Sequence, residues 1–302
     1  MRERRRPASI LAAIGLALFL PLGWLLAHVP ARAGLWIGRR LGDLIWLVLP
    51  RRQAMTLANL ARAFGRERSL SELRRLGRHS FEHLGMNVVE ACVFFFRAPA
   101  VLLSRVELCG MEHVHAAATL GKGILLLTAH YGNWELLAAS HTLTIFPLSV
   151  VVRPMDDPLM DRVVERFRLR SAVELIAKRQ ALPEIRDALR RGRMVGILLD
   201  QNASRAEGVF APFFGIPAST SKALAVISLR TGAPVVPVFI RRVEGGRHRV
   251  EVQPVIPSPA AGDVADYTAA FNRSIEAAVR RAPEQWFWMH NRWKTRPRSE
   301  MA

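Results

Sequence analysis

The sequence predicts an α/β domain with a mainly parallel sheet flanked by helices, preceded by an N-terminal membrane-anchoring helix. Three observations predict this class: a long apolar segment near the N-terminus, short apolar runs beyond residue 120 that have the length of buried strands, and helical patterns that alternate with those runs. We divide the chain into an anchor with an interfacial helix over residues 1–50 and a globular domain over residues 51–302.

The N-terminal apolar segment, Pro7–Val29, carries no Asp, Glu, Lys or Arg and is long enough to cross a hydrocarbon core of about 30 Å. A cleavable signal peptide is the alternative, because a basic stretch precedes the segment and residues 31–33 (ARA) resemble a cleavage site. We favour an uncleaved anchor, since the run is longer than a signal-peptide core and Trp24 suits a membrane interface. Arginines lie on both sides of the segment, so we expect an anchor that faces the cytoplasm. Charges interrupt the apolar residues 35–49, which predicts an amphipathic helix on the membrane surface.

Beyond Pro50, apolar residues recur at three- and four-residue spacing, which predicts helices over Thr56–Phe64 and Leu70–Phe96. Short apolar runs predict buried strands at residues 123–129, 148–152, 173–177, 194–199 and 234–240. Helical patterns fall among or after these runs, at residues 159–170, 182–191, 221–230 and 267–281. The strict alternation of residues 247–255 predicts a half-exposed edge strand.

Composition narrows the class of protein and of partner. Half of the 302 residues are apolar, which excludes an intrinsically disordered chain. Lys and Arg number 43 against 25 Asp and Glu, and the net charge of +18 predicts an anionic partner: a nucleic acid, a membrane surface or an acidic substrate. Nucleic-acid binding ranks last because the basic residues are scattered and no binding motif accompanies them. Cys92 and Cys109 are too few for a disulfide framework or a cysteine metal site, so we interpret them as core thiols in a reducing compartment.

The most informative chemistry follows the first predicted strand, at residues 130–135 (HYGNWE). A strand that runs into a helix here places His130 at the carboxyl edge of the sheet, where α/β proteins bind ligands. Glu135 lies in the first helical turns and is positioned to turn back to one imidazole nitrogen, leaving the other free to accept a proton. A structural hydrogen bond is the alternative for such a pair. The chain contains no His-Glu-x-x-His, Gly-x-Ser-x-Gly or Walker motif, which disfavours a zinc peptidase, a serine hydrolase and a P-loop NTPase.

The HYGNWE block resembles the His-x4-Asp/Glu motif of the glycerolipid acyltransferase superfamily, and in particular its lipid A late acyltransferases, the lauroyl and myristoyl transferases of Gram-negative bacteria. Further blocks of the chain are similar to that family in the same order: VRPMDDPL at residues 152–159, FRLRS at 167–171, LDQ at 199–201, VFAPFFG at 209–215, PAST at 217–220 and PEQWFWMHNRWKTRP at 283–297. Asp157 stands where the family usually has Asn, and the LDQ block lacks the usual Pro.

This resemblance implies that residues 51–302 form an acyltransferase domain of the glycerolipid acyltransferase type. It implies transfer of an acyl chain from acyl carrier protein to a hydroxyl of a phosphorylated glycolipid, a lipid A precursor, at the cytoplasmic face of the bacterial inner membrane. Neither a metal nor another cofactor is implied. On this model His130 is the general base and Glu135 orients it and stabilises the imidazolium, while amides near Gly132 and Asn133 supply the oxyanion site.

The resemblance also indicates residues that bind substrate. Arg153, Arg168 and Arg170 are candidates for the phosphates of the glycolipid or of the carrier, because a guanidinium binds phosphate bidentately, whereas solvated helix charge is the alternative for the last two. Asn133 and Asp200 complete the predicted substrate-binding set, and for Asp200 a turn cap is equally compatible.

Two groups of aromatic residues have open interpretations. Phe210, Phe213 and Phe214 are compatible with an acyl groove or with the core. For the C-terminal segment, a place at the bilayer interface and a packed place in the domain are both compatible with the sequence; the residues concerned are Trp286, Trp288, Trp293, Arg292 and Lys294.

Alternative functions remain open. An acyltransferase of the same fold that acts on another lipid, such as a phosphatidylinositol mannoside or an amino-acid lipid, would have the same catalytic block. A non-catalytic membrane protein that binds anionic lipid is the alternative from a different class.

Overall fold

A seven-stranded sheet forms the centre of the computed structural model, which describes residues 20–152, 159, 169–178, 181–259 and 263–297. Its strand order is β1-β9-β8-β2-β5-β3-β4. Adjacent strands run parallel except for the antiparallel pair of β8 and β9. The bounds of these strands are Val106–Cys109 for β1, Ile124–Thr128 for β2, Leu148–Val152 for β3, Glu174–Ala177 for β4, Met194–Leu198 for β5, Val235–Arg242 for β8 and His248–Val252 for β9. The predicted α/β fold with a mainly parallel sheet is confirmed.

Helices cover both faces of the sheet, because alternate side chains of the central strands point to opposite faces. Leu125 and Leu127 of β2 belong to one core, with α9, α10 and α11, whereas Ile124 belongs to a second core with α5, α6 and α7. The bounds of these helices are Ala100–Leu103 for α5, Met111–Ala118 for α6, Trp134–Ser140 for α7, Ala181–Arg190 for α9, Ala223–Thr231 for α10 and Val264–Arg281 for α11. Burial on both faces explains why the strands read as continuous apolar runs in the sequence.

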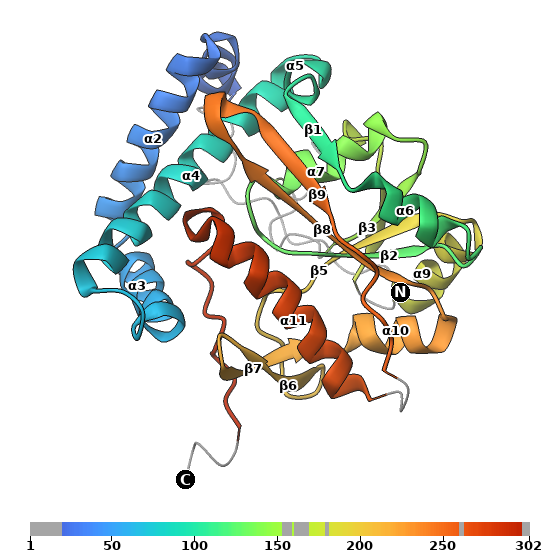
Figure 1. Cartoon of the computed structure of the whole chain (residues 1–302). Helices are drawn as coiled ribbons and strands as arrows, with labels where there is room; N and C mark the ends of the chain where they lie inside the picture. The colour runs from blue at the N-terminus through green and yellow to red at the C-terminus, as the bar shows by residue number, and fades with distance from the viewer. Residues whose placement is uncertain (1–19, 153–158, 160–168, 179–180, 260–262, 298–302) are drawn as a thin grey trace.

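The N-terminal helices α2 (Ala31–Val48), α3 (Pro50–Phe64) and α4 (Leu70–Phe96) form a group beside the sheet, with α4 between α2 and the strands (Figure 1). Glycines let α2 and α4 approach at backbone distance. A Cβ atom on Gly38 would lie 2.6 Å from the Cα of Met86, and one on Gly85 would lie 2.0 Å from the carbonyl oxygen of Gly38. The predicted helices over residues 35–49, 56–64 and 70–96 are therefore present, the first two with earlier starts.

Residues 247–255 do not form an edge strand. β9 lies inside the sheet between β1 and β8, and the described edges are β1 and β4. The sequence-based prediction was wrong because the four-residue β1, which covers the outer side of β9, was not recognised.

A separate hairpin, β6 (Gly208–Phe213) with β7 (Ile216–Ser221), occupies a segment that the sequence analysis left without strands. The PAST block at residues 217–220 lies in β7, and α10, predicted over residues 221–230, begins at Ala223. Pro212 pairs with Pro217 in this hairpin, and proline within a strand obscures the pattern from which strands are predicted.

The predicted membrane anchor lies largely outside the described residues. Residues 20–28 are helical, and across the part of the chain that is described, no helix combines the length and the apolar character needed to cross a bilayer. The predicted helix at residues 159–170 also falls mostly outside the described residues. Cys92 is buried, as expected for a core thiol, whereas Cys109 in β1 is only partly buried.

Candidate active site

The predicted base His130 lies beside Asp200 at the carboxyl edge of the sheet. β2 and β5 are parallel neighbours, with Thr128 paired to Leu198, so the loops that follow the two strands start at the same height. Nδ1 of His130 is 2.8 Å from Oδ1 of Asp200, and the backbone N–H of His130 donates to Oδ2 at 3.0 Å. Sheet topology thus pairs two residues that are 70 positions apart in sequence.

Asp200 is 2 % exposed and accepts a third hydrogen bond, from Nε1 of Trp286 at 2.8 Å. Burial alone would raise the pKa of its carboxyl group, but the charge of His130 and the hydrogen bonds from His130 and Trp286 lower that pKa below its usual value. An ionised Asp200 accepts a proton-bearing Nδ1, so Nε2 of a neutral His130 carries the lone pair. The side chain of His130 is 22 % exposed, and Nε2 lies 3.4 Å from the amide nitrogen of Gln201.

The carboxylate at Nδ1 is therefore Asp200, whereas the sequence analysis placed Glu135 at a ring nitrogen and gave Asp200 a substrate-binding or capping role. Glu135 stands in the first turn of α7, half-buried. The carboxylate of Asp200 that contacts Nδ1 is almost fully buried. The predicted substrate-binding or capping role of Asp200 stays a prediction. A catalytic role for Glu135 at another point of the site stays a prediction.

The turn between His130 and α7 is held by backbone contacts. Gly132 has a φ of 59°, and a Cβ atom there would lie 1.9 Å from the carbonyl oxygen of Ile240, so only glycine fits. The N–H of Gly132 donates to the carbonyl of Gln285 at 2.9 Å, and the carbonyl of His130 accepts from the N–H of Phe287 at 3.0 Å. The Gly132 amide, which we expected near the oxyanion, is thus already engaged.

The side chain of Asn133, predicted to bind substrate, is buried and makes its described contacts within the protein. Its Oδ1 caps α7 by accepting from the N–H of Leu136 at 3.0 Å, and its Nδ2 donates to Glu90 at 2.7 Å. These contacts give Asn133 a structural task in the turn.

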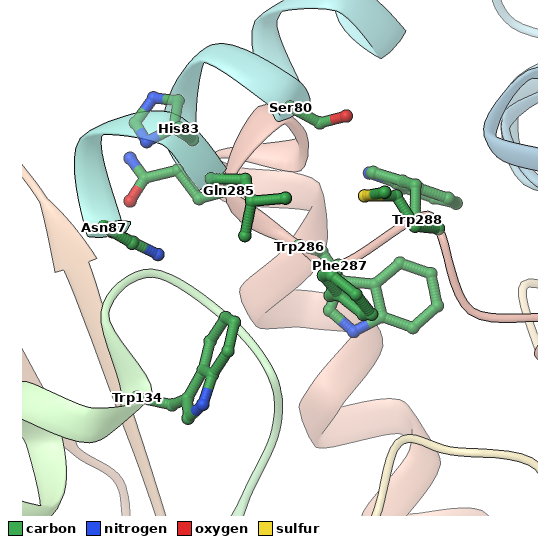
Figure 2. Close-up of a pocket in the computed structure, with 10 residues that line it drawn as sticks. Ser80, His83, Asn87, Trp134, Gln285, Trp286, Phe287 and Trp288 are labelled. Atoms are coloured by element: carbon green, nitrogen blue, oxygen red, sulfur yellow. The ribbon is translucent and has the colours of Figure 1, made fainter. Parts of the chain in front are cut away.

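A pocket lies between α4, Trp134 and the segment of residues 285–289 (Figure 2). Trp134 and Phe287 line it, and both rings also lie against the imidazole of His130, with centroids 5.3 and 6.3 Å from it. His83 of α4 lines the pocket as well, and burial, followed by the charges of Arg242 and Arg39, lowers its pKa to about 3. Four of the ten lining residues are Trp or Phe, and the polar ones include Asn87, Gln285 and the imidazole of His83.

Comparison with known proteins identifies the family of this chain. The family model of bacterial lipid A biosynthesis acyltransferases matches residues 2–295. The chain belongs to this family. It is 30% identical to the lipid A biosynthesis lauroyltransferase of Escherichia coli K12 over 91% of the chain and 89% of that protein, and 29% identical to the palmitoleoyltransferase of the same strain over 100% and 96%.

A more distant relative is a phosphatidylinositol mannoside acyltransferase of Mycobacterium tuberculosis, 26% identical over 61% of the chain and 58% of that protein. The protein is therefore an acyltransferase, and the contact between His130 and Asp200 lies at the sheet edge where the HYGNWE block follows β2.

Of the three arginines predicted to bind phosphate in this acyltransferase, Arg153 and Arg168 lie outside the described residues. Arg170 is exposed, and its guanidinium donates to the carbonyls of Phe94 at 3.1 Å and Arg97 at 2.7 Å. These carbonyls end α4, where a cation is favourable. The contacts of Arg170 thus anchor a helix end.

The aromatic segments of the acyltransferase are packed. Phe213 and Phe214 are buried in the core, which confirms the core interpretation for both, whereas Phe210 is partly buried. The tryptophans of the C-terminal segment, with Arg292, are also buried, and Lys294 is exposed; the tryptophans are Trp286, Trp288 and Trp293. The packed alternative for this segment is confirmed.

The C-terminal segment also closes around the loop that carries Asp200. His290 accepts from the N–H of Asn202 at 2.9 Å, and Arg292 donates to the carbonyl of Ser219 at 2.8 Å. The hydrogen bond from Trp286 to Asp200 was not predicted. The one feature of the sequence that pointed to a role for Trp286 was its position in the C-terminal block that resembles the family. No group of three His, Cys, Asp or Glu side chains within the described ranges is placed to hold a metal ion. That the reaction uses no metal stays a prediction.

Proposed function

We propose that this acyltransferase moves a fatty acyl chain from acyl carrier protein to a hydroxyl of a phosphorylated glycolipid, a lipid A precursor, at the cytoplasmic face of the inner membrane. The observation that carries the mechanism is the contact of 2.8 Å between Nδ1 of His130 and the buried carboxylate of Asp200. It leaves Nε2 as the proton acceptor on the side of the ring toward Gln201.

In the proposed reaction, Nε2 of His130 takes the proton of the acceptor hydroxyl while the oxygen attacks the thioester carbonyl. The resulting imidazolium is stabilised by the carboxylate of Asp200, whose Oδ1 lies 2.8 Å from Nδ1 of His130 and does not take its proton. The tetrahedral intermediate then collapses, the carbon–sulfur bond breaks, and the leaving thiolate recovers the proton from Nε2. Both proton transfers use the same nitrogen, so the base returns to its starting state.

The proposal includes further residues because they lie in the sequence blocks that resemble the family. Glu135, five positions after His130, supplies a second carboxylate near the acceptor site, and Arg153 and Arg168 bind phosphate. The amide of Gln201 is placed to donate to an oxygen held at Nε2, since its nitrogen lies 3.4 Å from that atom. The rings of Trp134 and Phe287, which line the pocket, lie against the imidazole of His130 and supply apolar surface beside it.

Exposed apolar side chains support a place on the membrane surface. Nine of the large exposed apolar residues fall within residues 20–49, namely Leu20, Leu22, Trp24, Leu25, Trp36, Leu44, Leu47, Val48 and Leu49. The opposite side of α2 carries the buried Gly34, Gly38, Gly42 and Trp46, which lie toward the protein. A helix with one packed face and one exposed apolar face suits the bilayer interface.

A second acceptor class is a candidate because of the mycobacterial relative. Phosphatidylinositol mannoside also presents sugar hydroxyls and a phosphate, so the same dyad would serve it. The two acceptors, and an amino-acid lipid as a third, are distinguished by their products.

The test is transfer of labelled acyl chain from acyl carrier protein to a purified lipid A precursor in detergent, with phosphatidylinositol mannoside as a parallel acceptor and mass spectrometry of both products. We expect His130→Ala to lower kcat by about 10² to 10⁴-fold, the usual contribution of a general base. Near-normal turnover by the folded variant would contradict the base assignment. Wild-type protein that binds the lipids but transfers no acyl chain would favour the non-catalytic lipid-binding alternative.

A further inference from the structure

A cluster of buried polar side chains lies behind the turn that carries His130. It joins Glu90 of α4, Arg242 of β8, His248 of β9 and Asn133 of the turn itself, and all four are buried. Because each side chain comes from a different part of the fold, the cluster ties α4 and two strands to the turn.

Glu90 is the acceptor at the centre of this cluster. Its Oε1 accepts from Nη1 of Arg242 and from Nε2 of His248, the latter at 2.9 Å. Its Oε2 accepts from Nη2 of Arg242 at 2.9 Å and from Nδ2 of Asn133 at 2.7 Å. Burial alone would raise the pKa of Glu90, but Arg242 and His248 hold it well below its usual range. Glu90 is therefore ionised, and a buried carboxylate in this state requires donors.

The cluster fixes which way the Asn133 amide faces. Its Nδ2 donates to Glu90, so its Oδ1 is turned toward the N–H of Leu136, the bond that caps α7. Reversing the amide would place its oxygen against the carboxylate. Asn87, one helical turn before Glu90, donates to the carbonyl of Gly132 at 2.6 Å, and Figure 2 shows it beside the segment that carries Trp134. α4 thus holds two consecutive residues of the turn.

We propose that Glu90 is a positioning residue for acyl transfer, which through Asn133 holds the turn after His130 and keeps the imidazole against Asp200. This inference rests on the proposed role of His130 as the base. The start of the turn is held by Asp200 and Phe287, and its end by the bond from Asn133 to Glu90. Releasing the end lets the imidazole leave its place, and a displacement of about 1 Å costs about 100-fold in rate.

The decisive variant is Asn133→Asp. It keeps an oxygen to cap α7 but presents a carboxylate oxygen to Glu90 in place of a donor. We expect kcat to fall about 10- to 100-fold, with the KM of both substrates unchanged, because the pocket and the exposed groups are untouched.

The double variant Glu90→Gln with Asn133→Asp exchanges donor and acceptor. The amide nitrogen of the new glutamine can donate to the new carboxylate, while its oxygen keeps accepting from Nη1 of Arg242 and from His248. Nη2 of Arg242 loses Oε2 as an acceptor but keeps its bond of 2.8 Å to Asn87, and one negative charge stays in the cluster. We expect kcat to recover to within about threefold of the wild-type protein. A residue with a purely structural role would affect stability without this reciprocal recovery.

Wild-type protein and His130→Ala run in the same assay, with circular dichroism and the melting temperature as folding controls. The matched control is Glu276→Gln, a carboxylate of α11 that accepts from the N–H of Phe214 at 2.7 Å, and its kcat should stay unchanged. Wild-type kcat in Asn133→Asp, or a folded double variant that stays slow, overturns the inference. If Asn133→Asp does not fold, the double variant alone decides: a folded double variant with kcat within about threefold of wild type supports the inference, and a folded but slow one overturns it. A wild-type protein without transfer activity would instead overturn the proposed function together with the inference.

Discussion

Replacing Asp200 by Asn tests the dyad most directly, because the two oxygens of Asp200 have different donors. Oδ2 accepts from the backbone N–H of His130 and from Nε1 of Trp286, whereas Oδ1 faces Nδ1 of His130. In Asp200→Asn the single amide oxygen will face the two N–H donors, since the reverse orientation leaves both unsatisfied. The amide NH₂ then points at Nδ1, which must be the unprotonated nitrogen. The proton moves to Nε2, and the base loses its lone pair.

The magnitude follows from the cost of restoring the reactive tautomer. Turning the amide would leave two buried donors without an acceptor, at about 1–3 kcal/mol each, or about 2–6 kcal/mol in all. This corresponds to about 30- to 10⁴-fold in kcat. The variant also loses the negative charge that stabilises the imidazolium, so we expect a decrease in kcat at the upper end of this range. The equivalent exchange in a Ser-His-Asp triad lowers kcat about 10⁴-fold. The KM values should stay unchanged because Asp200 is buried.

The assay is the rate of labelled acyl transfer with both substrates saturating, together with the melting temperature of each variant. Asp263→Asn is the matched control, because Asp263 caps α11 by accepting from two backbone N–H groups and the same exchange there should leave kcat unchanged. A folded Asp200→Asn variant with kcat within about threefold of wild type would refute the assignment, and a change confined to KM would return Asp200 to substrate binding.

Three further predictions concern the membrane face, the helix contact and the pocket histidine. Trp36→Glu should lower the affinity for anionic vesicles about tenfold or more, because it removes apolar area from the interface. The control Ile145→Glu changes an 85 % exposed residue outside α2 and should leave vesicle binding unchanged. Equal effects of the two variants in a sedimentation assay would contradict a role for α2. Gly85→Ala should lower the free energy of unfolding by about 1–3 kcal/mol in a urea titration, because the added Cβ has no space against α2. The control Gly196→Ala, where the nearest atom to the added Cβ is 3.7 Å away, should lower this free energy less. Equal decreases would contradict the close contact between α2 and α4. The pKa of His83 is lowered to about 3 in the folded protein, so the unfolded chain binds the extra proton below its own pKa of 6.5, and stability is lost as the pH falls through this window. Between pH 7.5 and 5.5 the loss should be about 1 kcal/mol, absent in His83→Gln, and an identical pH slope in both proteins would refute it.

The sequence predicted the strands that are buried on both faces and the place of His130 at a strand end, because these depend on local apolar runs. It did not predict that Asp200 reaches Nδ1. That contact depends on β2 and β5 being neighbours in register, and strand order is not encoded in the local pattern of either segment. Glu135 was the natural sequence-based partner because it is near in the chain, whereas the sheet brings a distant carboxylate nearer to the ring nitrogen.

The same limit explains the missed hairpin and the misplaced edge strand. β1 has four residues, too few for a clear alternation, and without it β9 reads as an edge. Pro212 and Pro217 face each other across β6 and β7, so the two strands lack the usual composition although they pair over their whole length. The sequence left the aromatic block before Gly215 open between an acyl groove and the core, and in the structure Phe213 and Phe214 are buried while Phe210 is partly exposed.

The buried charges around the dyad are better explained by geometry than by stability. Glu90 and Arg242 form a buried ion pair, and Arg292 is a buried cation whose pKa burial lowers to about 10 even though the charge of Asp200 raises it. Replacing such pairs by apolar residues is often neutral or stabilising, so their presence is weak evidence of a stability role. The hydrogen bonds of these charged groups are instead directional. Glu90 accepts from the turn after β2, and Arg292 donates to the carbonyl of Ser219 in β7 and to the carbonyl of Gln201, which follows Asp200. A general base needs its ring nitrogen held to within a fraction of an ångström. Charged hydrogen bonds in a low-dielectric interior hold the turn in this way, whereas apolar packing alone would let the turn shift.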